Sequence, residues 1–233
     1  NEHMLTYLTF AQGFQAGGFE TLCFGNLTAG CAGQIYDPQT VDSFELGFKS
    51  DLLDNTVRLN LAAFYAMYDD IQQTAVDVGD PNVQGDESFP LQNVGDVDVY
   101  GAELEVTWAP VESVNIFGML GWQDSDYGSL NPLASAALSG ADDLPSNPHL
   151  NGKVGFTYTV PASDMVEFFY GADLYYSDDY YSTVDNVLKI DSFTRLNGFL
   201  GIGQPDKRWQ VVLTATNIGG AEDNVSGIYA PGF

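Results

Sequence analysis

Residues 100–108 read Tyr100-Gly-Ala-Glu-Leu-Glu-Val-Thr-Trp108, and residues 114–122 read Val114-Asn-Ile-Phe-Gly-Met-Leu-Gly-Trp122. In the first run, apolar or aromatic side chains occupy every second position, with Gly, Glu and Thr between them. Because successive side chains of a strand point to opposite faces, this period of two predicts two strands, each with one apolar and one polar face. The intervening residues 109–113, which include a proline, predict a tight turn.

The same alternation recurs along the chain and predicts nine strands. They cover residues 4–14, 44–49, 57–68, 100–108, 114–123, 150–160, 165–181, 190–203 and 208–218. Most of these strands are longer than the five or six residues usual in soluble sheets. We therefore expect an all-β fold, an antiparallel up-and-down sheet of about nine strands that forms part of a transmembrane barrel.

The predicted connections alternate between short and long. The short ones cover residues 51–55, 109–113, 161–164 and 204–207, and the long ones cover 15–40, 71–97, 124–149 and 182–189, with a further connection beginning near 219. Tight turns at one end of a sheet and long loops at the other are typical of outer-membrane barrels, whose short turns are periplasmic and whose long loops are extracellular. Aromatic residues near both ends fit the two interfacial girdles of such a barrel: Trp108 and Trp209 at the short turns, and Tyr175, Tyr176, Tyr180 and Tyr181 at the long loops.

Composition excludes several classes of protein. The chain has 233 residues, with 32 acidic against 7 basic ones and a net charge of −25. Nucleic acid is therefore not an expected partner, because its binding depends on Lys and Arg. Hydrophobic residues make up 45% of the chain, yet no run of eighteen apolar residues occurs, which excludes a transmembrane helix.

The polar faces of the predicted strands carry charged and amide side chains. These are Glu45, Arg58, Asn60, Glu103, Glu105, Asn115 and Gln123. They could line a site for a ligand or a plug. They could equally be polar only because the interior of a wide barrel holds water and polar protein.

Several motifs together resemble one family. They are Tyr7-Leu-Thr-Phe-Ala-Gln-Gly-Phe-Gln-Ala-Gly-Gly-Phe19, Glu45-Leu-Gly-Phe-Lys-Ser50, Asn60-Leu-Ala-Ala-Phe-Tyr65, Tyr68-Asp-Asp-Ile-Gln72, Asn93-Val-Gly95, Gly101-Ala-Glu-Leu-Glu105, Leu144-Pro-Ser-Asn-Pro148 and Thr216-Asn217-Ile218. Their order and spacing over nearly the whole chain resemble the barrel of TonB-dependent outer-membrane receptors of Gram-negative bacteria.

The resemblance implies a barrel of about 22 strands around a plug domain. The nine strands would match roughly strands thirteen to twenty-one of such a barrel, so residues 1–233 are expected to be a C-terminal portion of it, without the plug, the early strands or the last strand. Such receptors bind a scarce nutrient at extracellular loops, for example a siderophore or other metal chelate, cobalamin or an oligosaccharide. They import it with energy from TonB–ExbB–ExbD, acting through the plug. Outer-membrane lipid and lipopolysaccharide are implied partners, and a surface lipoprotein is a further one.

Acidic residues in the long loops are the candidate ligand-binding set. They are Asp77, Asp80, Asp86, Glu87, Asp124 and Asp126. Their charge favours a neutral or cationic ligand, or a metal chelate. No resident cofactor is expected, although Ca²⁺ at paired acids such as Asp69-Asp70, Asp142-Asp143 or Asp178-Asp179 is an open alternative.

Catalytic residues are not expected. His3 and His149 are the only histidines and lie in no recognisable motif, so we do not expect an enzyme. Cys23 and Cys31, eight residues apart, are predicted either to form a disulfide or to remain two loop thiols. Two other functions share much of this pattern: a passive porin-like channel, and a secreted all-β adhesin or carbohydrate-binding domain.

Overall fold

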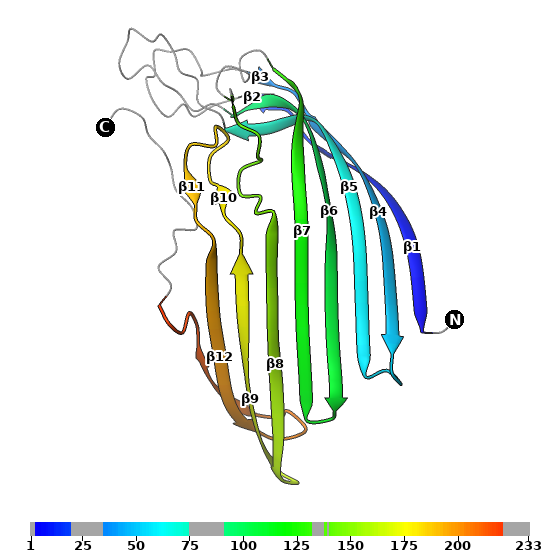
Figure 1. Cartoon of the computed structure of the whole chain (residues 1–233), viewed down its shortest axis with the longest axis vertical. Helices are drawn as coiled ribbons and strands as arrows, with labels where there is room; N and C mark the ends of the chain where they lie inside the picture. Colours follow the sequence, from blue (N-terminus) through cyan, green and yellow to red (C-terminus); the bar gives the residue numbers. More distant parts are fainter. Residues whose placement is uncertain (1–2, 20–34, 75–90, 132–137, 139, 221–233) are drawn as a thin grey trace.

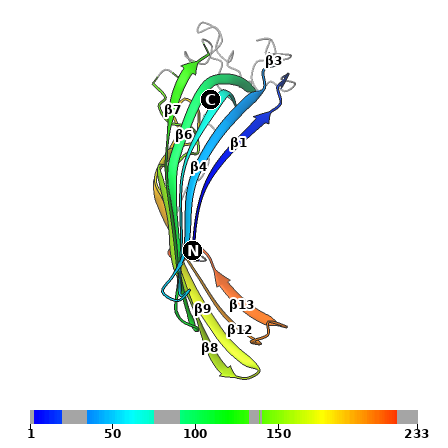
Figure 2. The same cartoon turned by 90° about the vertical axis from the view of Figure 1, so that its right-hand side faces the viewer.

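Nine long strands form one antiparallel sheet, in which each strand pairs with its neighbours along the chain. The computed structural model describes residues 3–19, 35–74, 91–131, 138 and 140–220. The strand order is β1-β4-β5-β6-β7-β8-β9-β12-β13, and the sheet is strongly curved (Figures 1 and 2). Its strands are β1 (Met4–Gln15), β4 (Gln39–Leu52), β5 (Val57–Thr74), β6 (Leu91–Val111), β7 (Val114–Leu130), β8 (Leu150–Ser163), β9 (Val166–Ser177), β12 (Phe193–Gly203) and β13 (Gln210–Ala215). The nine predicted strands and the all-β fold are thereby confirmed.

The connections between these strands differ in length at the two ends of the sheet. Tight turns join β4 to β5, β6 to β7, β8 to β9 and β12 to β13 at one end, and the longer connections lie at the other (Figure 1). Leu53, Asp54 and Asn55 close the first turn with φ angles of 50°, 56° and 65°. No helix among the described residues is long and apolar enough to cross a membrane.

Two small hairpins lie at the long-connection end. They are β2 (Gly18–Phe19) with β3 (Ile35–Tyr36), and β10 (Tyr180–Tyr181) with β11 (Lys189–Ile190). The first falls in the predicted loop 15–40, whereas Tyr180, Tyr181 and Ile190 of the second were predicted at the ends of longer strands. The predicted strand 165–181 is therefore two elements. The chain turns at Asp178, whose carboxylate accepts a hydrogen bond from the Asp179 N–H at 3.0 Å.

Of the long strands, β5, β6 and β7 extend furthest beyond the apolar alternation. β5 runs to Thr74, β6 begins at Leu91 and β7 continues to Leu130, so parts of the predicted loops 71–97 and 124–149 are strand. Gly95 (φ 139°) lies at an irregularity that shifts the register between β6 and its neighbours. The extension depends on backbone pairing, which an apolar pattern does not report.

One face of the sheet is apolar across strands. The register places Leu61 opposite Leu104, and Leu104 opposite Leu120. Leu61 and Leu120 keep 48% and 47% of their surface exposed although they lie mid-sheet, because they point away from the rest of the described chain. An exposed apolar face of this extent is what a lipid-facing surface requires.

On the opposite face, aromatic rings cover glycines. Five directly paired positions each place an aromatic side chain over a glycine of the next strand: Tyr7 on Gly47, Phe64 on Gly101, Phe117 on Gly155, Phe199 on Gly171 and Phe169 on Gly201. At Gly101, an added Cβ would lie 2.4 Å from the Trp122 carbonyl oxygen and 2.7 Å from the Phe64 ring. Such pairs let the ring lie against the strand and fill the space that glycine leaves.

Replacing Gly101 with alanine should therefore destabilise the sheet by about 1–3 kcal/mol, because the new methyl group has no room. Gly118→Ala is the matched control, since a Cβ there meets only the Lys153 carbonyl oxygen at 3.8 Å. Denaturant unfolding of the intact native protein in detergent measures the free energy of unfolding of both variants. Equal stability of the two variants would contradict the steric argument.

The lipid-facing assignment predicts different losses of stability for the same substitution at two adjacent residues. Leu120 lies in the apolar row, whereas Met119 pairs with Glu105 on the polar face. Leu120→Arg should cost about 2–4 kcal/mol in a bilayer, the penalty for a cation near the midplane, and Met119→Arg should cost much less. Unfolding in lipid vesicles compares the two, and a larger penalty at Met119 would reverse the assignment of faces.

Candidate functional site

The polar face carries the charged residues that the sequence analysis assigned to it. Tyr7 donates a hydrogen bond from its hydroxyl to Glu45 (2.5 Å), and the Asn60 amide donates to Glu105 (3.0 Å). These bonds run between strands, so they fix side chains as well as backbone. The remaining members, Arg58, Glu103, Asn115 and Gln123, share this face by register.

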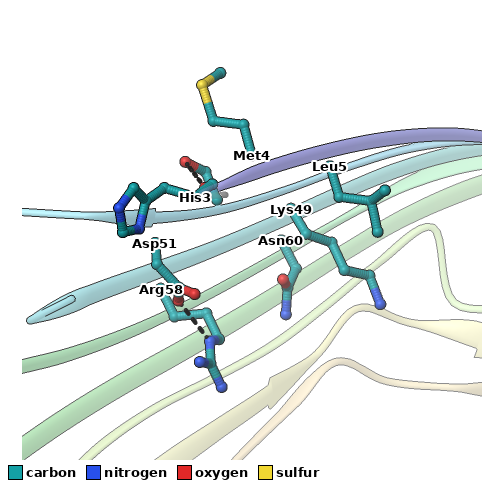
Figure 3. Close-up of a pocket in the computed structure, with 8 residues that line it drawn as sticks. His3, Met4, Leu5, Lys49, Asp51, Arg58 and Asn60 are labelled. Atoms are coloured by element: carbon teal, nitrogen blue, oxygen red, sulfur yellow. Dashed lines mark hydrogen bonds and ion pairs between the residues drawn. The ribbon is translucent and has the colours of Figure 1, made fainter. Parts of the chain in front are cut away.

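A hollow of about 340 Å³ lies on this face at the short-turn end (Figure 3). Arg58 binds the Asp51 carboxylate at 2.8 Å, and Lys49 and Asn60 lie on the same side of the sheet. Met4, in contrast, points to the other side (Figure 3). The hollow is thus cationic and amide-lined in an otherwise acidic chain.

A second polar cluster lies further along the sheet. Lys153 binds Asp173 at 3.0 Å, and the Asn197 amide donates to the same carboxylate at 3.0 Å. A hollow of about 530 Å³ beside it is also lined by Tyr175 and Arg195. Tyr175 therefore belongs to the polar face and not to the outward aromatic girdle, because it pairs with Lys153 and Arg195 in the register.

The predicted girdle residue Tyr176 does lie on the outward face, because it pairs with Gly152 in the row of Leu120, and further outward rings come from β5, β6 and β7. The rings of Tyr65 and Tyr100 lie 6.3 Å apart, and those of Tyr100 and Trp122 lie 6.0 Å apart. The Tyr65 hydroxyl donates to Asp98 at 2.5 Å, on the side toward the long connections. Rings with a polar tip directed at carboxylates match the boundary between an apolar and a wet environment.

Two amides fasten the β2–β3 hairpin to the extended ends of β5 and β6. The Asn93 amide donates to the carbonyl oxygens of Asp37 (3.0 Å) and Asp70 (2.7 Å), and accepts from the Asp37 N–H at 2.6 Å. Gln72 donates to the carbonyl oxygens of Ala16 (3.1 Å) and Asp37 (2.9 Å). Both amides belong to motifs that carry the family resemblance.

A small core holds the segment between β7 and β8 against the sheet. Val94 and Leu138 are 0% and 2% exposed and pack with Ala141 and Val184. The Ser125 hydroxyl accepts hydrogen bonds from the Leu144 N–H and the Asn147 amide. Sequence analysis had assigned these residues to loops and found no core there, because the apolar positions are few and far apart in the chain.

Asn186 joins two of these long connections. Its amide oxygen accepts from the N–H groups of Asp142 and Asp143 at 3.0 Å each, and its Nδ2 donates to the Asp143 carbonyl oxygen at 2.8 Å. The residue has φ 53°, a left-handed conformation that Asn tolerates better than most residues. The backbone of Asp143 is thereby held in place.

Three side chains of metal-ligating types meet at this end of the sheet. The His149 Nε2 atom lies 3.2 Å from Asp143 Oδ1 and 3.5 Å from Asp124 Oδ1. All three ligand atoms lie within 4.8 Å of one another. Sequence reasoning had set His149 aside, because its partners are 6 and 25 residues away and form no motif.

The predicted ligand-binding residues are only partly within the described chain. Asp77, Asp80, Asp86 and Glu87 lie outside it, as do Cys23 and Cys31. Asp124 and Asp126 are described, and both belong to strand β7 and not to a loop. Their role in ligand binding stays a prediction.

Some of the paired acids considered for Ca²⁺ have other side-chain partners. The Thr40 hydroxyl donates to the Asp69 carboxylate at 3.5 Å, whereas Asp70 is bonded through its backbone N–H, which donates to Asp96 at 3.2 Å. Lys189 binds Asp179 at 2.6 Å, and this lowers the pKa of the Asp179 carboxyl. Occupation of Asp179 by an ammonium group makes the 178–179 pair a poorer cation site than its sequence suggests.

Asn186→Ala should loosen residues 140–149, because three hydrogen bonds to the backbone are lost, at a cost of about 1–3 kcal/mol. Asn55→Ala is the matched control: Asn55 also has a left-handed backbone (φ 65°) but lies in the β4–β5 turn. Hydrogen exchange of residues 140–149 reports the difference. Unchanged protection from exchange in Asn186→Ala would contradict a stabilising role for the Asn186 hydrogen bonds.

The family comparison gives a match over nearly the whole chain. The model described as "TonB dependent receptor-like, beta-barrel" covers residues 1–218. The match includes every strand of the nine-stranded sheet.

Solved structures with a similar arrangement include three whose names describe uptake or siderophore receptors. The ferric yersiniabactin uptake receptor FyuA from Yersinia pestis superposes with a TM-score of 0.76 at 18% identity, covering 99% of this chain and 32% of that one. The ferric preacinetobactin receptor BauA from Acinetobacter baumannii gives 0.66 at 18%, covering 96% and 31%. The siderophore receptor PiuA from the same organism gives 0.64 at 21%, covering 97% and 31%. The chain thus spans about a third of the length of these relatives, and at such identities the likeness shows the fold.

Proposed function

Because the chain belongs to the TonB-dependent receptor β-barrel family, we propose that it forms the C-terminal part of an outer-membrane receptor barrel that imports a scarce nutrient with energy from TonB. In this proposal the long connections face the outside of the cell and the tight turns face the periplasm. The role of the chain is transport and not catalysis. Its direct contributions are a lipid-facing wall, a polar inner wall and the ligand-side connections.

The observation that carries this proposal is the combination of a single up-and-down sheet with a two-faced side-chain pattern. The apolar row through Leu61, Leu104 and Leu120 lies on one face, and the hydrogen-bonded pair Asn60–Glu105 lies on the other. A soluble sandwich would instead cover the apolar face with a second sheet. The described chain contains one large sheet.

The charge of the chain supports the proposed ligand class. The chain has a net charge of −25, and the extended strand ends add Asp96, Asp98, Asp124 and Asp126 to the long-connection end. Such a surface repels strongly anionic ligands and favours a neutral or cationic ligand, or a metal chelate. Ferric siderophore complexes fall within that class, and the matched receptors FyuA, BauA and PiuA are named for such ligands. Cobalamin and neutral oligosaccharides remain in the same charge class.

The test is uptake by cells that carry or lack the gene for the native polypeptide. Cells with the intact protein should accumulate one iron chelate faster, and deletion of TonB should abolish the difference. Accumulation that is unaffected by TonB loss would favour the passive channel. Absence from the outer-membrane fraction would favour the secreted adhesin.

A loop deletion tests the acidic ligand-binding residues within that experiment. Removal of residues 78–88, which include Asp80, Asp86 and Glu87, should weaken binding of the transported ligand by at least about tenfold while barrel assembly is retained. Unchanged affinity in a correctly assembled deletion protein would remove these residues from the site.

A further inference from the structure

We propose that Asp124, Asp143 and His149 form a binding site for a divalent transition-metal ion of the Zn²⁺ type, which ties the segment between β7 and β8 to strand β7. The three residues come from three different places: Asp124 from the extended end of β7, Asp143 from the following connection, and His149 from the position just before β8. This inference does not depend on the identity of the transported ligand.

The spacing of the ligand atoms fits a shared ion. Two ligands that each lie about 2.1 Å from a tetrahedral ion are about 3.4 Å apart. The His149 Nε2 atom lies 3.2 Å and 3.5 Å from the two aspartate oxygens, close to that value. These contacts are also a hydrogen bond to Asp143 and ion pairs to both carboxylates, which a bound ion would replace.

The chemistry of the donor set selects the type of metal. One imidazole and two carboxylates suit Zn²⁺ and neighbouring first-row ions, whereas Ca²⁺ and Mg²⁺ prefer oxygen ligands throughout. Two aspartates also compensate the charge of a divalent ion. Within the described part of the chain, the ion-pair partner of both carboxylates is the same His149 nitrogen, so no lysine or arginine competes there.

The ligands are held in position by groups outside the cluster. The Asp124 carboxylate accepts hydrogen bonds from the Ser125 N–H (2.8 Å) and the Tyr100 hydroxyl (3.4 Å). The Asp143 backbone is held by Asn186, and the His149 carbonyl oxygen accepts from the Gln123 N–H at 3.0 Å. Hydrogen bonds to a ligating carboxylate, as at Asp124, orient metal ligands and raise affinity, and the backbone contacts fix the positions of the other two residues.

The side chains also leave room for the rest of the coordination sphere. The Asp124, Asp143 and His149 side chains are 36%, 31% and 46% exposed. Three protein ligands at a solvent-accessible position leave the fourth site for water or for an outside ligand. A bound ion would restrain residues 140–149 in addition to the contacts of Asn186.

The experiment is calorimetric titration of Zn²⁺ into the intact native polypeptide, purified in detergent without a polyhistidine tag and stripped with chelator. His149→Gln and Asp143→Asn should each weaken one binding event by more than about tenfold, a loss expected when part of a metal site is removed. Asp185→Asn is the matched control, because Asp185 lies between β10 and β11 at the same end of the sheet, outside the cluster and outside the predicted ligand-binding set. Limited proteolysis between 140 and 149 should slow on addition of Zn²⁺ in the wild type and in the control only.

Three results would overturn the proposal. One is Zn²⁺ binding that is equal in the wild type and in His149→Gln. Another is the absence of any Zn²⁺ binding by the wild type. A third is Ca²⁺ binding that depends on Asp143 and is tighter than Zn²⁺ binding, which would make the cluster a hard-cation site. Heat-modifiable gel mobility verifies that each variant is a folded barrel before it is compared.

Discussion

Continuous backbone pairing between chain-neighbouring strands is the constraint on which the rest of the structure depends. In the nine-stranded sheet, every strand between the edge strands β1 and β13 has a partner on both sides, so the N–H and C=O groups of its paired residues are satisfied within the sheet. In lipid, an unsatisfied backbone group costs several kcal/mol, and pairing of this kind is the only way for a strand to cross. Once the backbone is satisfied, one face can be apolar and the other can carry charges. The Gly–aromatic pairs, such as Phe64 on Gly101, then fill the polar face without interrupting the ladder.

The connections at the two ends of the sheet differ in structure. Tight turns close one end. At the other end, long connections pack on a small core around Val94 and Leu138, and amides such as Asn93 and Asn186 bind the backbone of neighbouring segments. The described parts of these connections are therefore held in defined positions by packing and hydrogen bonds. Ordered segments can present ligand-binding groups at fixed positions, which mobile loops achieve only at an entropic cost.

The errors of the sequence analysis share one physical cause. Asp124 and Asp126 were assigned to a loop because apolar alternation stops near them, yet β7 continues for several residues in a wet environment that needs no apolar side chains. Tyr175 was assigned to an outward girdle by its position along the chain, whereas the register turns it to the polar face. His149 was set aside for want of a motif. In each case the deciding partner lies on another strand or connection.

The sequence by itself determined the all-β fold, the number of long strands, their approximate positions and the alternation of short and long connections. It did so because a period of two, broken by turn residues, is a local property that each segment carries alone. Only the tertiary structure decided where strands end beyond the apolar band, how the connections pack, and which distant side chains meet. The meeting of Asp124, Asp143 and His149 depends on the β7–β8 register and on the Asn186 contacts. Those are long-range interactions, and no window along the chain contains them.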